Sequence, residues 1–146
     1  MRRPLVLVAA TALALLALAP AAMSERQASS TLSVRASSYG RVLFDGRGYV
    51  LYAFTRDPRR RSVCYGACAK AWPVYFANKS LSAGPGVKRS LLGTTKRTDG
   101  RRQVTYAGRP LYYYVGDRKP GQITCQNVAE FGGTWLVVRP SGKLVR

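Results

Sequence analysis

Three cysteines carry the most distinctive side-chain chemistry in this sequence. Cys64 and Cys68 are four residues apart, and Cys125 lies far along the chain. One helical turn or a tight loop would bring Cys64 and Cys68 within disulfide distance. We therefore favour that pair, and the alternative is a Cys64–Cys125 bridge. In an exported chain, three cysteines predict one disulfide and one remaining thiol.

A redox role is the alternative to a structural cross-link at Cys64 and Cys68. The three arginines at positions 59–61 would favour a thiolate nearby. The spacing, however, is C-x-x-x-C rather than the C-x-x-C of thioredoxin-like sites, and no βαβ pattern surrounds it. We expect a structural bridge, and a redox-linked envelope protein is the second functional interpretation.

Two carboxylates stand at matching places in the chain. Asp57 and Asp117 each end a predicted strand and begin a turn. The turn composition favours an Asp that accepts backbone N–H bonds in an Asx-type turn. The alternative is a cation or ligand site, but calcium needs six to eight oxygens. The remaining acids show no spacing for such a loop: Glu25, Asp45, Asp99 and Glu130.

The composition excludes several classes of catalytic site. The 146 residues include no histidine, which excludes a Ser-His-Asp triad, His-ligated zinc and His-ligated haem. No nucleophile elbow and no closely spaced pair of carboxylates is present. We predict no catalytic residue, no metal and no cofactor, and we expect a protein that is not an enzyme.

The charge balance is strongly basic. Lys and Arg number 24 against 6 Asp and Glu, which gives a formal net charge of +18. Such a charge favours anionic envelope polymers or a membrane surface as partners. The alternative explanation is the codon bias of a GC-rich genome, which enriches arginine. No nucleic-acid-binding motif accompanies the charge, so we expect no specific nucleic-acid partner. The predicted basic patch consists of Arg59, Arg60, Arg61, Arg101, Arg102, Arg118 and Lys119.

The N-terminus has the pattern of a secretory signal peptide. Arg2 and Arg3 precede an apolar run over 5–19, and small residues follow at 19–21. We predict cleavage after Ala21, with an uncleaved anchor as the alternative. The first cysteine is Cys64, so the predicted cleavage site offers none for a lipid anchor. We therefore expect an exported protein of the extracellular space or cell envelope, with a flexible lead-in over 22–38.

The rest of the chain predicts a single, mainly β domain over 39–146. Short apolar runs alternate with Gly, Pro and Asp, and no long helical period occurs. Residues 42–44 and 49–55 are expected to form a hairpin across Asp45-Gly46. The segment 62–74 is expected to be a loop or short helix. Further strands are expected at 103–106, 111–115 and 135–138.

An internal repeat organises these strands. The segment 51–57 matches 111–117 at an offset of 60 residues. A cysteine and then a tryptophan follow each copy, at Cys64 and Trp72 and at Cys125 and Trp135. We infer two related antiparallel β units, at about 41–76 and 101–140, packed pseudo-symmetrically. Two units are too few for a solenoid.

These residues resemble a secreted bacterial repeat family, the lipoproteins with a Yx(FWY)xxD motif. Further segments at 64–73, 99–106 and 131–135 resemble other parts of that family's pattern, and the resemblance covers about 39–142. Many members carry a lipid anchor, and the resemblance implies no particular activity. The motif residues are Tyr52, Phe54, Asp57 and Trp72 in the first copy and Tyr112, Tyr114, Asp117 and Trp135 in the second.

Strand alternation leaves two interpretations for the motif aromatics. Tyr52 and Phe54 would share one face of their strand, as would Tyr112 and Tyr114. The opposite faces are also largely apolar, so these strands are expected to be covered on both sides. We expect the rings in the core with their phenol groups at polar partners. An aromatic platform for a sugar or another planar ligand is the alternative.

Overall fold

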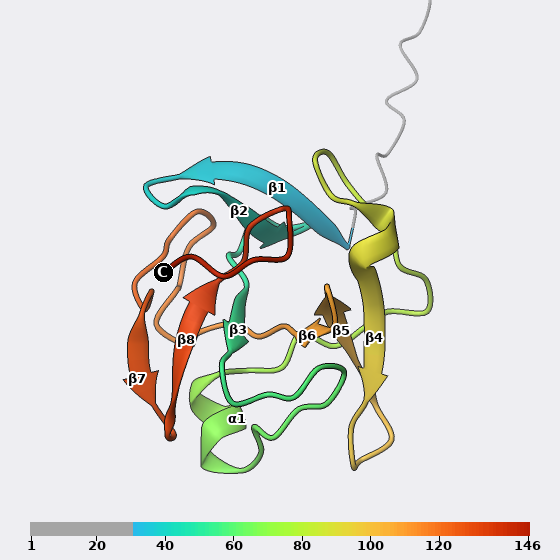
Figure 1. Ribbon diagram of the computed structural model, residues 1–146, viewed down its shortest axis with the longest axis vertical. Helices are drawn as coiled ribbons and strands as arrows, with labels where there is room; N and C mark the ends of the chain where they lie inside the picture. Colours follow the sequence, from blue (N-terminus) through green and yellow to red (C-terminus); the bar gives the residue numbers. More distant parts are fainter. Residues whose placement is uncertain (1–30) are drawn as a thin grey trace, which may run out of the picture.

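A computed structural model of the chain describes residues 31–146, and the predicted signal peptide lies outside this range. The described part is mainly β, as the turn-rich sequence predicts (Figure 1). Its elements are β1 (Leu32–Ser37), β2 (Gly40–Asp45), β3 (Tyr52–Phe54), α1 (Ala67–Ala71), a 3-10 turn (Arg89–Leu91), β4 (Leu92–Lys96), β5 (Arg102–Tyr106), β6 (Arg109–Pro110), β7 (Val128–Glu130) and β8 (Gly133–Val137).

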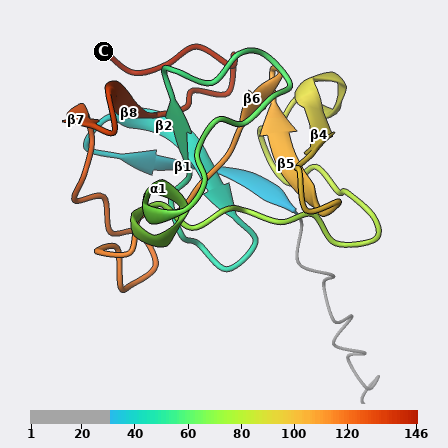
Figure 2. The same cartoon turned by 90° about the horizontal axis from the view of Figure 1, so that it is seen from below.

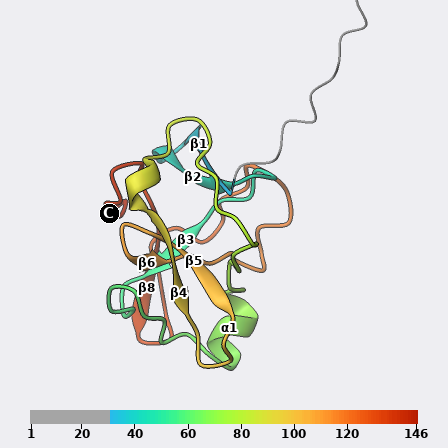
Figure 3. The same ribbon diagram turned by 90° about the vertical axis from the view of Figure 1, so that its right-hand side faces the viewer.

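The strands form three small antiparallel sheets, in the orders β1-β2, β3-β8-β7 and β4-β5-β6. The β1–β2 hairpin and α1 lie at opposite ends of the domain (Figures 1 and 3). Strand β3 runs between the β7–β8 pair and the sheet of β4, β5 and β6 (Figure 1). This central strand carries the first copy of the repeated motif.

Strand β1 corrects the predicted flexible lead-in. It pairs with β2 along its full length, from Leu32 opposite Asp45 to Ser37 opposite Gly40. The Ser-rich composition conceals a short apolar–polar alternation, in which Leu32 and Val34 are buried. The folded domain therefore begins before position 39. The prediction of a flexible lead-in over 22–38 is wrong for the residues of β1.

The predicted hairpin of 42–44 with 49–55 forms only at its turn. Asp45 Oδ1 accepts the N–H groups of Arg47 and Tyr49, each at 2.9 Å, and Phe44 bridges Val50. Beyond that bridge, β3 leaves β2 and pairs with β8. All three side chains of β3 are buried, so the strand lies inside the domain, where β8 supplies hydrogen-bond partners that β2 does not.

The predicted strand at 111–115 is also shorter than expected. Arg109 and Pro110 pair with β5 in a tight hairpin that sets Pro110 opposite Thr105, and the N–H of Leu111 donates to the Val104 carbonyl at 3.0 Å. Tyr112 then makes isolated bridges to Tyr52 and to Val74. The segment does follow the predicted course out of the hairpin, but its ladder partners come from the other repeat.

Side chains from the two faces of each motif strand enter two different cores. Tyr52 and Tyr112 belong to one buried cluster, together with both tryptophans and all three cysteines. Leu51 and Leu111 belong to a second cluster, formed with residues of β2, β4 and β5. All four of these side chains have no exposed surface. The expectation that both faces would be covered is confirmed for 51–54 and 111–112, whereas Thr55 and Val115 are exposed.

The two repeats are interlocked through their backbones. The N–H of Leu43 in β2 donates to the carbonyl of Val138 at 2.9 Å, and that of Val104 in β5 donates to Tyr75 at 2.9 Å. Val138 and Tyr75 each stand three residues after their repeat's tryptophan. Each repeat's hairpin therefore lies against the tryptophan segment of the other repeat. Each repeat therefore needs the other repeat to supply hydrogen-bond acceptors for the backbone of its hairpin.

Candidate functional site

The repeated motif meets itself at the centre of the domain. The N–H of Tyr52 donates to the carbonyl of Tyr112 at 2.9 Å, and the N–H of Tyr112 donates to the carbonyl of Tyr52 at 2.9 Å. The same symmetry continues further along the strands. The N–H of Thr55 donates to the carbonyl of Thr134 at 3.0 Å, and the N–H of Val115 donates to the carbonyl of Ala71 at 3.2 Å. A pseudo-two-fold axis therefore passes between the two motif strands.

The motif tyrosines and aspartates are exchanged between repeats. The Tyr52 hydroxyl donates to Asp117 Oδ2 at 2.7 Å, and the Tyr112 hydroxyl donates to Asp57 Oδ2 at 2.6 Å. Burial raises the pKa of both phenols, and the facing carboxylates raise it further. The phenols stay protonated and act as donors. Each copy of the motif thus supplies one donor and one acceptor to its partner copy.

The second oxygen of each aspartate closes a loop. Asp57 Oδ1 accepts the N–H of Val63 at 2.8 Å, and Asp117 Oδ1 accepts the N–H of Thr124 at 2.9 Å. Both donors immediately precede a cysteine of the repeat. The expectation that these aspartates accept backbone N–H bonds is correct, but the Asx-turn geometry is wrong. The donors lie six and seven residues downstream rather than two.

The motif aromatics form a stack around the axis. The two indoles lie almost parallel at its centre, and each phenol or phenyl ring has a counterpart in the other repeat. Tyr52 and Tyr112 have no exposed surface, which leaves neither ring face open to a ligand. The ring pairs and centroid distances are Trp72–Trp135 at 4.0 Å, Tyr52–Trp72 at 5.2 Å, Tyr112–Trp135 at 5.1 Å, Phe54–Trp135 at 4.3 Å and Tyr114–Trp72 at 4.7 Å.

The symmetry fails at the indole nitrogens. Trp72 Nε1 donates to Glu130 Oε2 at 2.8 Å. Trp135 Nε1 is buried and has no hydrogen-bond partner among residues 31–146. Glu130 stands five residues before Trp135, and the corresponding place before Trp72 is Ala67, the first residue of α1. The first repeat thus has a helix where the second repeat has an acid-bearing strand.

The cysteines also differ between the repeats. Cys64 and Cys68 form a disulfide with their Cα atoms 5.3 Å apart, and the alternative bridge to Cys125 is absent. Cys125 is a free thiol with 8% of its surface exposed. Burial raises the pKa of this thiol, which disfavours the reactive thiolate. Cys64 and Cys68 therefore form a structural bridge, and the environment of Cys125 is that of an unreactive thiol.

A buried arginine supports the first repeat, and the sequence analysis missed it. Arg97 is 5% exposed, although it stands in a basic stretch that favours a solvated face. Its Nη1 donates to Ser62 Oγ at 2.7 Å and to Gln103 Oε1 at 2.9 Å, and its Nη2 donates to the Cys64 carbonyl at 2.7 Å. The one local signal was Gln103, a polar residue at a core position of a predicted strand.

Arg97 joins the disulfide loop to the motif. The Ser62 hydroxyl that receives Arg97 also lies 2.7 Å from the Tyr112 hydroxyl, which in turn donates to Asp57. Burial raises the pKa of Asp57, while the hydrogen bonds from Tyr112 and Val63 and the charge of Arg97 partly offset that rise. The network therefore compensates a carboxylate that burial would otherwise disfavour.

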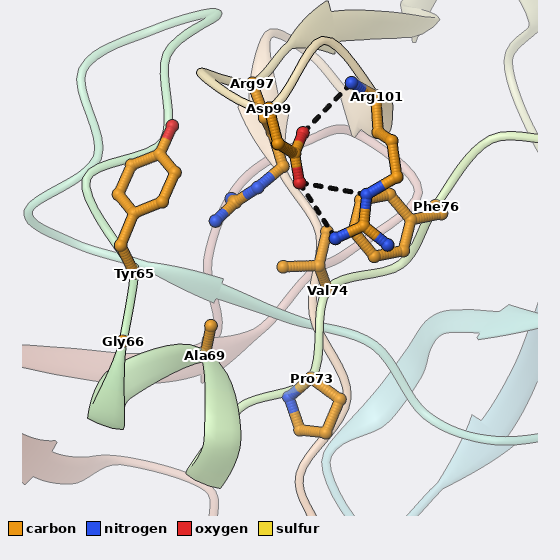
Figure 4. A pocket seen from close by; sticks show the side chains of 9 residues that line it. All are labelled: Tyr65, Gly66, Ala69, Pro73, Val74, Phe76, Arg97, Asp99 and Arg101. Atoms are coloured by element: carbon orange, nitrogen blue, oxygen red, sulfur yellow. Dashed lines mark hydrogen bonds and ion pairs between the residues drawn. The ribbon is translucent and has the colours of Figure 1, made fainter.

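A hollow of about 350 Å³ opens beside this network (Figure 4). Tyr65 and Phe76 lie on opposite sides of it, and an arginine side chain lies close to each ring. The Arg97 guanidinium is 4.1 Å from the Tyr65 ring centre, and that of Arg101 is 3.9 Å from the Phe76 ring centre. Arg101 also pairs with Asp99 at 2.8 Å. Both arginines are already engaged, so the hollow offers a ligand little unneutralised charge.

The predicted basic patch is divided in the structure. The loop after β3 carries residues 59–61 and reaches β4, where the Thr95 hydroxyl donates to the Arg60 carbonyl. Arg102 begins β5 on the same sheet, and Arg101 directly precedes it. Residues 118 and 119 lie in the loop between β6 and β7, which contacts the turn after β2 through Gly121 and Gly48 at 2.9 Å. The loop after β6 lies across the domain from β4 and β5 (Figures 1 and 2).

Two further observations concern residues 31–146 alone. No group of three or more His, Cys, Asp or Glu side chains is placed to hold a metal ion there. Within the same range, none of the helical segments has the length and apolar character needed to cross a membrane.

Comparison with known proteins identifies the repeat. A family model described as a secreted repeat of unknown function matches residues 33–75 and 93–139. Both matches begin earlier than the repeat boundaries predicted from the motif, because each unit includes the first strand of its hairpin, β1 or β4. Neither a curated protein nor a solved structure matches the chain.

Proposed function

Since the chain belongs to the family of secreted repeats of unknown function, we propose that it is a non-enzymatic binding module of the cell envelope that contacts anionic polymers. The N-terminal segment would direct export and then be removed by cleavage after Ala21. The interlocked core serves as a rigid scaffold, and the basic loops form the binding surface. Loops on a rigid scaffold are a common place for recognition.

The observation that carries this proposal is that the acidic side chains of residues 31–146 are all engaged within the protein. Without Arg2, Arg3, Arg26 and Glu25, residues 31–146 carry 21 Lys and Arg side chains and 5 Asp and Glu side chains. All five acids are used internally. Asp57 and Asp117 accept tyrosine hydroxyls, Glu130 accepts an indole N–H, and Asp45 and Asp99 bind arginines two residues downstream.

The basic surface is therefore largely unneutralised. Within the described part of the chain, the ion pairs are those of Asp45 and Asp99 alone. A surface of one sign attracts a polymer of the opposite sign and releases its condensed counterions on binding. Affinity gained in this way falls steeply as salt is added. The expected ligand is a repeating anion rather than one small molecule.

The test is binding of the exported chain to immobilised inorganic polyphosphate over a series of salt concentrations. We expect binding at low ionic strength and a linear fall of log K with log salt concentration. Neutral dextran is the matched control surface. Phosphatidylglycerol vesicles form a second arm, and binding to them alone would assign the surface to membranes instead. No binding to polyphosphate at low ionic strength would overturn the proposal.

A further inference from the structure

A second hollow, of about 450 Å³, lies between the loop after β3 and the sheet of β4 and β5. Arg59 and Arg60 line one side of it, and the hydroxyl-bearing residues Ser90, Thr94 and Thr105 line the other. Hereafter we refer to this hollow as the β4 pocket. No Asp or Glu lines it. It differs in this respect from the hollow beside α1, which contains Asp99.

The arginine side of the β4 pocket is held in a fixed and unusual conformation. Arg60 has a φ of 59°, in the left-handed region that residues other than glycine rarely adopt. Its N–H donates to the Gly108 carbonyl at 2.7 Å, and its own carbonyl accepts the Thr95 hydroxyl. Ala107, on the opposing hairpin, has a φ of 50°. Such conformations persist only where the surroundings impose them, and they concentrate at binding sites.

The Thr105 side chain lies in the wall of the pocket. Only 3% of the surface of this residue is exposed. Its cross-strand neighbour is Gly93, where a Cβ would stand 3.2 Å from Thr105 Oγ1. Because Gly93 has no side chain, the hydroxyl stays uncovered. The hydroxyl can therefore donate a hydrogen bond to a ligand in the pocket.

The guanidinium groups around the pocket repel one another. The Arg59 side chain packs over Gly108, with its Nε 3.4 Å from the position of a Cβ there. Burial lowers the pKa of Arg109, the next residue along, and the charges of Arg59 and Arg146 lower it further. Guanidinium groups that repel one another in the free protein gain from an anion placed between them.

We propose that the β4 pocket binds a phosphate group, with Arg59 and Arg60 on its oxygens and the Thr105 hydroxyl as a further donor. Arginine suits this role because its planar fork can donate two parallel hydrogen bonds to a phosphate. The proposal deepens the proposed function, since it rests on the idea that the protein meets anionic polymers and names phosphate as the recognised group. The same chemistry could come from a phosphate polymer or from a phospholipid headgroup.

The test is titration of the exported chain with inorganic phosphate, followed by NMR of the backbone amides. We expect the amides of Gly93 and Thr105 to shift together in a saturable way. Arg59→Gln should weaken the phosphate affinity about tenfold, which corresponds to the loss of one charge-assisted contact. The matched control is Arg118→Gln in the loop after β6, where we expect less than about a twofold change.

Two variants guard against misfolding. Thr105→Val removes only the hydroxyl but alters a buried position, so the exposed double variant Arg59→Gln with Arg60→Gln is measured in parallel. An unchanged amide spectrum in the double variant, outside the loop after β3, shows that the fold is intact. Loss of phosphate shifts at Gly93 and Thr105 in that variant would support the pocket.

The outcomes separate this proposal from the one it rests on. Equal weakening by Arg59→Gln and Arg118→Gln, or shifts spread over all basic loops, would overturn the β4 pocket and leave general polyanion binding standing. Saturable binding of phosphate at the pocket without any binding to polyphosphate would overturn the polymer proposal and keep the pocket. Glycerol-phosphate oligomers and phosphatidylglycerol vesicles, each tested with wild type and Arg59→Gln, identify the source of the phosphate.

Discussion

The loop from Asp57 to Cys64 and the loop from Asp117 to Cys125 occupy equivalent places in the two repeats. In both, one carboxylate oxygen accepts a tyrosine hydroxyl from the other repeat, and the second oxygen accepts a backbone N–H just before the cysteine. These shared contacts link the two repeats at the axis. The motif therefore describes what joins the two units into one domain.

The surroundings of the two loops differ. The first loop carries three consecutive exposed arginines at 59–61 and ends at a disulfide cysteine, and it is bound by the buried Arg97 from the turn between β4 and β5. The second carries a free thiol and, at its aspartate, the hydroxyl of Thr124 at 2.6 Å. What the repeats share stabilises the fold, and what they do not share is available for recognition. The β4 pocket lies on the first loop, at the place of greatest difference.

The largest expected effect comes from removing Arg97, the buried arginine that binds the first loop. Arg97→Met leaves Ser62, Gln103 and the Cys64 carbonyl without the guanidinium donor, and it leaves the half-buried Asp57 without a nearby cation. We expect a loss of about 3 kcal/mol in the free energy of unfolding, measured by urea denaturation.

The control for this prediction is Arg102→Met, the same chemical change at an exposed position of β5. We expect it to cost less than about 0.5 kcal/mol. If Arg97→Met were equally mild, the first loop would not depend on its arginine, and the contrast between the two loops would be wrong.

The next effect concerns the disulfide. Replacing Cys64 and Cys68 together with alanine opens a five-residue loop, for which the loop-entropy relation gives about 2 kcal/mol. Cys125→Ala breaks no bridge and should cost less than about 1 kcal/mol. Native wild-type protein should show no thiol reactive toward a bulky reagent, and the denatured protein should show one. A reactive thiol in the native state would revive the redox interpretation.

The tyrosines sharpen the comparison at the motif itself. Tyr52→Phe and Tyr112→Phe each remove a hydrogen bond to a carboxylate, which costs about 1.5 kcal/mol. We expect Tyr112→Phe to be the more harmful, because its hydroxyl also contacts Ser62 in the Arg97 network. Urea denaturation of both variants measures the order. A larger loss for Tyr52→Phe would show that the second loop is the more dependent on its motif.

The smallest effect at neutral pH is the titration of the buried phenols. The pKa of Tyr52 and Tyr112 is raised in the folded state, and that of Tyr75 is raised to about 12. Their contribution to stability is therefore complete below the ordinary tyrosine pKa of about 10 and is lost as the pH rises above it. Stability should be flat from pH 7 to 9 and then fall. Phenolate absorbance that develops near pH 10 with the fold intact would contradict this.

Local patterns in the sequence predicted much of the fold. Alternation correctly indicated that 51–54 and 111–112 are buried on both faces, although 111–115 forms no regular strand, and the repeat correctly indicated two related units. The spacing of Cys64 and Cys68 favoured the disulfide that forms. These features depend on residues near one another in the chain, and sequence periodicity reports such contacts directly.

The features that could not be predicted depend on contacts between the repeats. Nothing local shows that Tyr52 bonds to Asp117 rather than to an acid of its own copy, or that β3 leaves β2 for β8. Arg97 stands in a charged stretch that favours a solvated face, and its one signal is the polar Gln103 at a core position of the next strand. Strand β1 was missed because its apolar alternation is brief and its composition is that of a linker.

The most direct test of the account is a pair of double-mutant cycles across the motif, measured by urea denaturation. Tyr52→Phe combined with Asp117→Ala should show a coupling energy of about 1 kcal/mol or more, because the two groups share a hydrogen bond. Tyr52→Phe combined with Asp57→Ala, within one copy, should be close to additive. Strong coupling within the copy and none between copies would contradict the exchange of partners on which the account rests.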